Sequence, residues 1–176
     1  VALLTEAITG LNTAAVRALM TESVAGMSTA QIAALTSQDV AAMTTSHISV
    51  LTTNQVIALT TADAASLTTS HAATLTSAQI VVMTTADFSA LTTQSLRGLT
   101  TDTFSNLTSN QIIALTTQQA STISTSQISA LTSQQLISLQ TDDLAAFTTA
   151  EIRALTSTTI AGLSSADRKS TRLNSS

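Results

Sequence analysis

An eight-residue repeat constrains this chain more than any other feature. Counting in eights from Leu3, the first position of every unit is apolar as far as Leu163. Position 2 is Thr, Ser or Asn except at Leu4, Met20 and Gln140, position 3 is always Thr or Ser, and position 6 is apolar in every complete unit. Position 5 is usually Gln, Asp or His and position 8 is mostly small, so the consensus is L-T-T-x-Q-I-x-A. A period this strict predicts a repeat architecture.

Each unit carries the signals of a helix start. In the unit that begins at Leu51, Thr52 and Gln55 have the spacing of a capping box, in which the hydroxyl and the longer side chain each accept a hydrogen bond from the backbone N–H of the other residue. Leu51 and Val56 then fall at the two positions of a hydrophobic staple. A cap at Thr53 would break this staple, so we favour position 2 as the N-cap and expect one helix of about six residues per unit.

The charged residues support helices independently of the caps. Acidic side chains in the first helical turn and cations in the last turn complement the helix dipole, whereas a β-structure predicts no such separation. All nine acids ahead of residue 167 stand at position 4 or 5, and the three arginines of the repeat stand at position 7: Glu6, Glu22, Asp39, Asp63, Asp87, Asp102, Asp142, Asp143 and Glu151, with Arg17, Arg97 and Arg153.

No single unit can fold alone, because isolated helices shorter than about 12 to 15 residues are unstable in water. Stacked neighbours must supply the stability, and the sequence therefore predicts an all-α solenoid of short capped helices. A 24-residue period also runs through position 5: Gln31, Asp39, His47, then Gln55, Asp63, His71, then Gln79, Asp87, Ser95. This period has two explanations, either duplication of a 24-residue block in the gene or a coil of three units.

If the coil has three units, positions 1 and 6 line a triangular core. Gln31, Gln55 and Gln79 then form one ladder, and Asp39, Asp63 and Asp87 form a second one on the next side. We expect the aspartate ladder to face water, where physiological salt screens charges beyond about 8 Å.

The repeat ends abruptly near residue 166. Residues 167–176, DRKSTRLNSS, have no octad pattern and match the translation of a common sequencing adapter, so we assign 1–166 to the solenoid and 167–176 to an artefactual or disordered tail. Together with the non-Met start at Val1, this tail indicates a fragment of a longer array. The basic residues of the tail are not interpreted as a nucleic-acid site.

Residues with catalytic or metal-binding potential are few. His47 and His71 could hold a metal with Asp39 or Asp63 nearby, but the simpler interpretation is that both histidines are exposed first-turn residues. The many hydroxyls lack a nucleophile motif such as G-x-S-x-G and are better explained by capping. We predict no catalytic, cofactor-binding or metal-binding residues and no enzyme activity.

Partners are constrained only by exclusion. Without the tail the repeat is acidic, which disfavours nucleic acid, and its polar positions lack the lysines and arginines that hold an amphipathic helix on a membrane. The sequence identifies no partner, and a protein or a surface ligand is the class that such a scaffold would bind.

The stretches LTSAQIVVMTTADFSALTT, residues 75–93, and LTSNQIIALTTQQ, residues 107–119, resemble the threonine-rich octapeptide arrays of very large bacterial surface or secreted proteins. The resemblance implies a structural scaffold or spacer, such as the stalk of an adhesin-like extracellular or cell-surface protein. A protein-recognition solenoid is the main alternative. A minor alternative is a threonine-rich β-solenoid with an ice-binding or glycosylated surface.

Overall fold

The computed structural model describes residues 8–155, and the segments 1–7 and 156–176, including the tail at 167–176, lie outside this range. Every regular element in the described range is a short helix, and no described residue is in a β-strand, so the β-solenoid alternative is wrong for this part of the chain. The helices are α2 (Thr13–Arg17), α3 (Thr21–Ala25), α4 (Thr29–Ala33), α5 (Ser37–Ala42), α6 (Thr45–Ser49), α7 (Thr53–Ile57), α8 (Thr61–Ser66), α9 (Thr69–Thr74), α10 (Ser77–Val81), α11 (Thr85–Ala90), α12 (Thr93–Gly98), α13 (Thr101–Ser105), α14 (Ser109–Ile113), α15 (Thr117–Ala120), α16 (Thr125–Ser129), α17 (Ser133–Ser138), α18 (Thr141–Ala145) and α19 (Thr149–Ala154).

Each helix begins where the capping signals predict. Thr52, at position 2, has the extended backbone of an N-cap, with φ −71° and ψ 159°, and its hydroxyl accepts a hydrogen bond from the amide of Gln55. The Oε1 atom of Gln55 accepts a hydrogen bond from the Thr52 amide, which completes the capping box. The same box recurs in most of the described helices, whereas Met20 and Gln140 provide no side-chain cap. The N-cap is therefore position 2, and the helices are four to six residues long.

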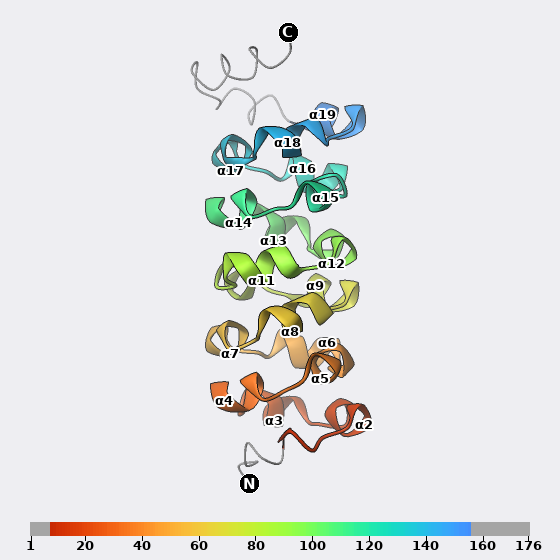
Figure 1. Ribbon diagram of the computed structural model, residues 1–176, viewed down its shortest axis with the longest axis vertical. Helices are drawn as coiled ribbons and strands as arrows, with labels where there is room; N and C mark the ends of the chain where they lie inside the picture. The colour runs from red at the N-terminus through yellow and green to blue at the C-terminus, as the bar shows by residue number, and fades with distance from the viewer. Residues whose placement is uncertain (1–7, 156–176) are drawn as a thin grey trace.

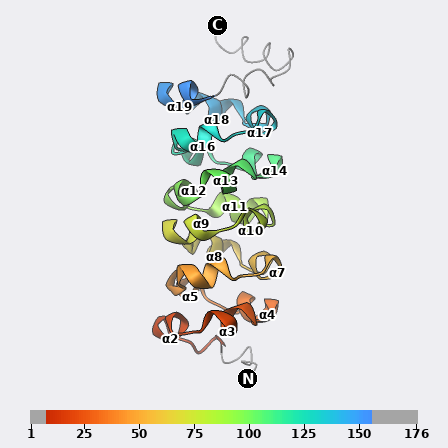
Figure 2. The ribbon, with the colours of Figure 1, turned by 180° about the vertical axis from the view of Figure 1, so that it is seen from behind.

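The helices stack in three columns around the solenoid axis. Each one packs on the helix three places further along the chain, so that α4, α7 and α10 follow one another in one column, α5, α8 and α11 in the second, and α6, α9 and α12 in the third. Figures 1 and 2 show the resulting column from opposite sides, with α2 at one end and α19 at the other. Three units therefore make one coil, which confirms the structural explanation of the 24-residue period.

Positions 1 and 6 fill the core of the column, as predicted. Leu51 and Val56 are both buried, and the corresponding residues are buried through most of the described chain. At one place a large position-6 residue stands over a small one: Phe88 of α11 lies one coil above Ala64 of α8, and both are inaccessible to water. Such a pairing of large with small side chains suits a closely packed core.

Candidate functional site

The most specialised part of the molecule is position 5 of the repeat. The buried polar residues of the described chain are the position-5 residues of sixteen successive units: Gln31, Asp39, His47, Gln55, Asp63, His71, Gln79, Asp87, Ser95, Thr103, Gln111, Gln119, Gln127, Gln135, Asp143 and Glu151. The expectations that the histidines are exposed and that the aspartate ladder faces water are therefore wrong. The reason is that position 5 points toward the coil beneath, where the neighbouring backbone covers it.

A glutamine at position 5 joins two successive coils. The Oε1 atom of Gln79 accepts a hydrogen bond from the Thr76 amide at 2.8 Å, and its Nε2 atom donates to the carbonyls of Ile48 and Leu51, both at 2.8 Å. Those carbonyls lie at the C-terminal end of α6 and in the turn to α7, one coil below. One side chain thus satisfies the start of its own helix and the end of another helix, whose carbonyls have no partner within the helix.

The histidines make the same joint with a ring. His71 accepts a hydrogen bond from the Thr68 amide at Nδ1, at 3.3 Å, and its Nε2 atom lies 2.9 Å from the Met43 carbonyl of the coil below. His47 contacts the Thr44 amide and the Leu19 carbonyl in the same way. Because both ring nitrogens are engaged, neither histidine has a free lone pair for a metal, and no cluster of three potential ligands occurs among the described residues.

Short side chains at position 5 make the joint where the helices approach more closely. The Ser95 hydroxyl of α12 bonds directly to the Leu67 carbonyl below it. Gly98 ends the same helix, and a Cβ atom added there would lie 2.5 Å from the Thr69 carbonyl oxygen of α9. The small residue at position 8 therefore lets the two helices approach at this site.

At Asp87 the direction of the bond between coils is reversed. Asp87 accepts a hydrogen bond from the Thr84 hydroxyl of its own cap at 2.6 Å, and another from the Thr61 hydroxyl of the coil below at 2.7 Å. These bonds compensate the buried carboxylate, which could not be left unpaired without a large cost. The Thr or Ser that every unit carries at position 3 therefore supplies a donor for Asp87 and for Asp143 one coil above.

Asp143 shows what happens when part of this arrangement is missing. Its unit has Gln140 at position 2 instead of a hydroxyl residue, and Oδ2 of Asp143 is buried without a hydrogen-bond partner. Burial raises the pKa of Asp143, while bonds from the Thr117 hydroxyl and the Gln140 backbone lower it by less. The buried charge at this joint is thus poorly compensated.

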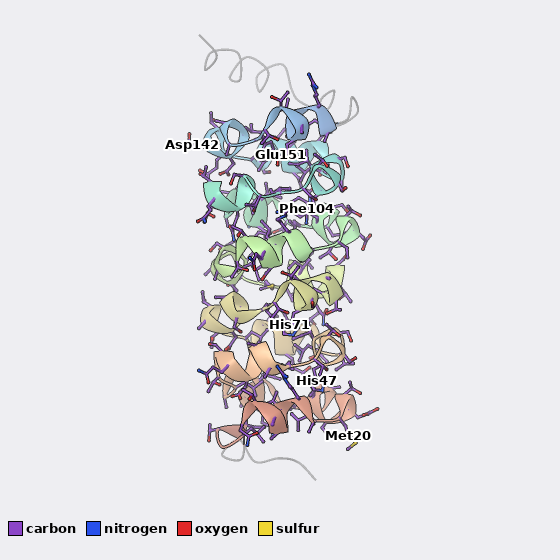
Figure 3. The ribbon with its side chains drawn as sticks, turned by 90° about the vertical axis from the view of Figure 1, so that its right-hand side faces the viewer. Met20, His47, His71, Phe104, Asp142 and Glu151 are labelled. Atoms are coloured by element: carbon purple, nitrogen blue, oxygen red, sulfur yellow. The ribbon has the colours of Figure 1, made fainter. Side chains whose placement is uncertain are left out.

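The outer surface is formed mainly by positions 2, 3, 4 and 7 and is mostly small or hydroxylic. Exposed aliphatic side chains at position 7 interrupt it twice, at Ile57 and Val81 on the stacked helices α7 and α10, and at Ile113 and Ile137 on α14 and α17. Met20 also projects from the surface and is 68% exposed (Figure 3). None of the described helices is long and apolar enough to cross a membrane.

One sequence signal could have revealed the joint. A capping box needs only an acceptor at its third helical residue, yet position 5 is dominated by side chains that also carry a donor, namely glutamine and histidine. Lysine and arginine do not occur at this position in any complete unit. A donor has no use in the capping box of an isolated helix, so the recurring glutamines and histidines at position 5 point to a second partner outside their own helix.

Comparison with known proteins identifies the repeat itself. No curated protein and no solved structure matches the chain. The model of the ALTTAQ repeat matches residues 1–37, 32–69, 80–119 and 136–167, which together cover most of the sequence. The octad with its threonine pair and its glutamine is the unit that this repeat describes, and the chain belongs to the ALTTAQ repeat family.

Proposed function

We propose that the chain is a structural scaffold, a stiff spacer in the stalk of a bacterial extracellular, adhesin-like protein. The observation that carries this proposal is the unbroken series of buried position-5 residues from Gln31 to Glu151. A buried polar residue thus lies between neighbouring coils throughout this range, and at most of these sites it hydrogen-bonds to the coil below. A uniform series of joints is what a load-bearing column requires.

The proportions of the column favour stiffness over reach. Stacked helices lie about 8 to 10 Å apart, so a coil of 24 residues advances only about 0.3 to 0.4 Å per residue along the axis. A polyproline linker advances about 3.1 Å per residue. A chain selected for length alone would gain more from an extended linker, whereas a column of this kind keeps a fixed distance and direction between the parts it connects.

Small-angle X-ray scattering on arrays with increasing numbers of coils tests the scaffold. We expect the long dimension to increase by about 8 to 10 Å for each added coil while the cross-section stays constant. An overall size that grows with the square root of the coil number would indicate a flexible chain and refute the proposal.

The surface location requires a test of its own. Threonine- and serine-rich outer positions and the resemblance to surface arrays support an extracellular stalk. Antibodies against the array should label intact cells of the source bacterium, and protease added outside the cells should remove the label. Labelling that requires lysis of the cells would place the array inside and remove this part of the proposal.

We assign no catalytic role to the array. The chain's two histidines have both ring nitrogens engaged in joints, and the hydroxyls at position 2 mostly act as helix caps. These groups are thereby committed to holding the coils together, which supports a structural role.

A protein-recognition role is the second candidate, and the exposed aliphatic pairs favour it. Ile57 is 52% exposed and Ile113 is 47% exposed, and each has an aliphatic residue one coil above it, Val81 and Ile137. Serine substitutions at all four sites should abolish capture of a specific protein partner without changing the thermal stability. A partner that binds the substituted and original arrays equally would exclude this surface.

A further inference from the structure

The two histidines of the chain form consecutive joints in one column of helices. His47 is on α6 and His71 is on α9, and these helices stack between α3 below and α12 above. Figure 3 labels both residues on neighbouring coils. The exposed fractions of His47 and His71 are 2% and 4%, so each imidazole lies between coils and away from solvent.

The hydrogen bonds at both sites require a neutral ring. The Nδ1 atom accepts from a backbone amide, Thr44 for His47 and Thr68 for His71, and therefore cannot itself carry a proton. The Nε2 atom carries the proton and donates it to the Leu19 or Met43 carbonyl. A protonated ring has two donors and no acceptor. The cap amide would then face an N–H group instead of a lone pair.

We propose that His47 and His71 make the stack of α3, α6 and α9 an acid-sensitive joint, which loosens when the imidazoles gain a proton. Protonation removes the acceptor from the start of each helix and leaves a charge buried between coils. Joints made by glutamine do not titrate. Acid therefore weakens the column at this place and leaves the glutamine-joined coils intact.

No neighbouring group compensates such a charge. On the helices that pack against α6 and α9, the charged residues are Glu22 on α3 and Arg97 on α12, both exposed, and no ion pair joins either to a histidine. Within the same coils, Asp39 and Asp63 bond to the caps of their own helices, at Thr36 and Thr60. His47 and His71 thus stand on adjacent helices of the column, without a buried acid bonded to either ring.

The direction of the pH effect follows from the environment of His71. Burial lowers the pKa of His71 below its ordinary value of 6.5, and the bond to the Met43 carbonyl offsets this only in part. Because the folded pKa lies below the unfolded one, the stabilising contribution of His71 is complete above pH 6.5 and is lost as the pH falls below that value. The population in which this joint is open should rise as the pH falls through that window, by at most about tenfold per pH unit for one proton.

Amide hydrogen exchange between about pH 7.5 and about pH 5 tests the proposal, because an ordinary histidine gains its proton in this range. After correction for the intrinsic pH dependence of exchange, protection of the Thr68 amide should fall below pH 6.5 by up to about tenfold per pH unit. The Thr44 amide should lose protection once the His47 ring is protonated. The Thr76 and Thr108 amides, which bond to Gln79 and Gln111, should keep their protection.

Two variants separate the histidines from every other titrating group. The double variant His47→Gln/His71→Gln keeps an acceptor and a donor at each site, as Gln55 does, and should lose the pH dependence while remaining folded. The variant Gln79→His should spread the acid sensitivity to α10. The proposal is overturned if the double variant loses protection with acid as the original chain does, or if both histidines become protonated, as followed by nuclear magnetic resonance, without any loss of protection.

Discussion

Replacing Gln79 with methionine tests the joint between coils most directly. Gln79 lies in the middle of the described column and is 3% exposed. Methionine has a similar length but can neither accept from the Thr76 amide nor donate to the Ile48 and Leu51 carbonyls. The substitution therefore removes three hydrogen bonds to backbone groups with little change in packing volume.

The expected loss of stability follows from these three bonds. A typical intramolecular hydrogen bond contributes about 0.5 to 1.5 kcal/mol net, which gives about 1.5 to 4.5 kcal/mol for the set. Loss of the bond to the Leu51 carbonyl should cost an amount in the upper part of the range for a single bond. The reason is that Leu51 is buried, so its carbonyl would be left without a partner away from water. The apolar methionine side chain recovers part of the loss by its own burial.

Two further substitutions of Gln79 separate the bond accepted from the Thr76 amide from the bonds donated to the coil below. Gln79→His keeps both bonds, as His71 does, and should cost little at neutral pH. Gln79→Glu keeps the acceptor for Thr76 but replaces the donor with a charge facing the carbonyls, so it should destabilise at least as much as methionine.

Urea unfolding followed by the far-ultraviolet circular dichroism of the helices measures the series, since the chain has no Trp or Tyr to report by fluorescence. Ala78→Ser, on the exposed face of the same helix, is the control and should leave the midpoint unchanged. A methionine variant as stable as this control would refute the joint. If the histidine variant were as unstable as the methionine variant, the hydrogen bond donated to the lower coil would not be the source of the stability that Gln79 provides.

Four other substitutions have outcomes set by single contacts. Gly98→Ala should destabilise by about 1 to 3 kcal/mol in thermal unfolding, because the new Cβ would lie 2.5 Å from the Thr69 carbonyl oxygen; Gly26→Ala, whose site meets only its own helix at 3.3 Å, should be close to neutral. Met20→Thr should stabilise by about 0.5 to 2 kcal/mol in urea unfolding, because it adds the missing N-cap hydroxyl, and an unchanged midpoint would contradict the capping argument. Gln140→Thr should stabilise at neutral pH by giving the Oδ2 atom of Asp143 a donor. In the original chain the raised pKa of Asp143 makes its contribution to stability fall as the pH rises from 3.8 through the folded pKa, and Gln140→Thr should reduce this slope in a pH series of unfolding curves.

The local structure could be predicted from the sequence because its determinants lie within one unit. Thr52, Gln55, Leu51 and Val56 fix the start of α7 through contacts between residues at most five apart. The predicted N-cap, the helical class and the burial of positions 1 and 6 are all confirmed, since capping and staple contacts depend only on this spacing.

The environment of position 5 was decided by the tertiary structure. Gln79 satisfies its own cap whether it is exposed or buried, so the capping pattern cannot show that its amide also bonds to Leu51, 28 residues earlier. That contact exists only because three helices complete a turn and the fourth lies over the first. The angle between successive helices sets the number of helices per coil, and this angle arises from the packing of several units against one another. The histidines looked like exposed first-turn residues for the same reason: the coil that buries them lies one full turn away in the sequence.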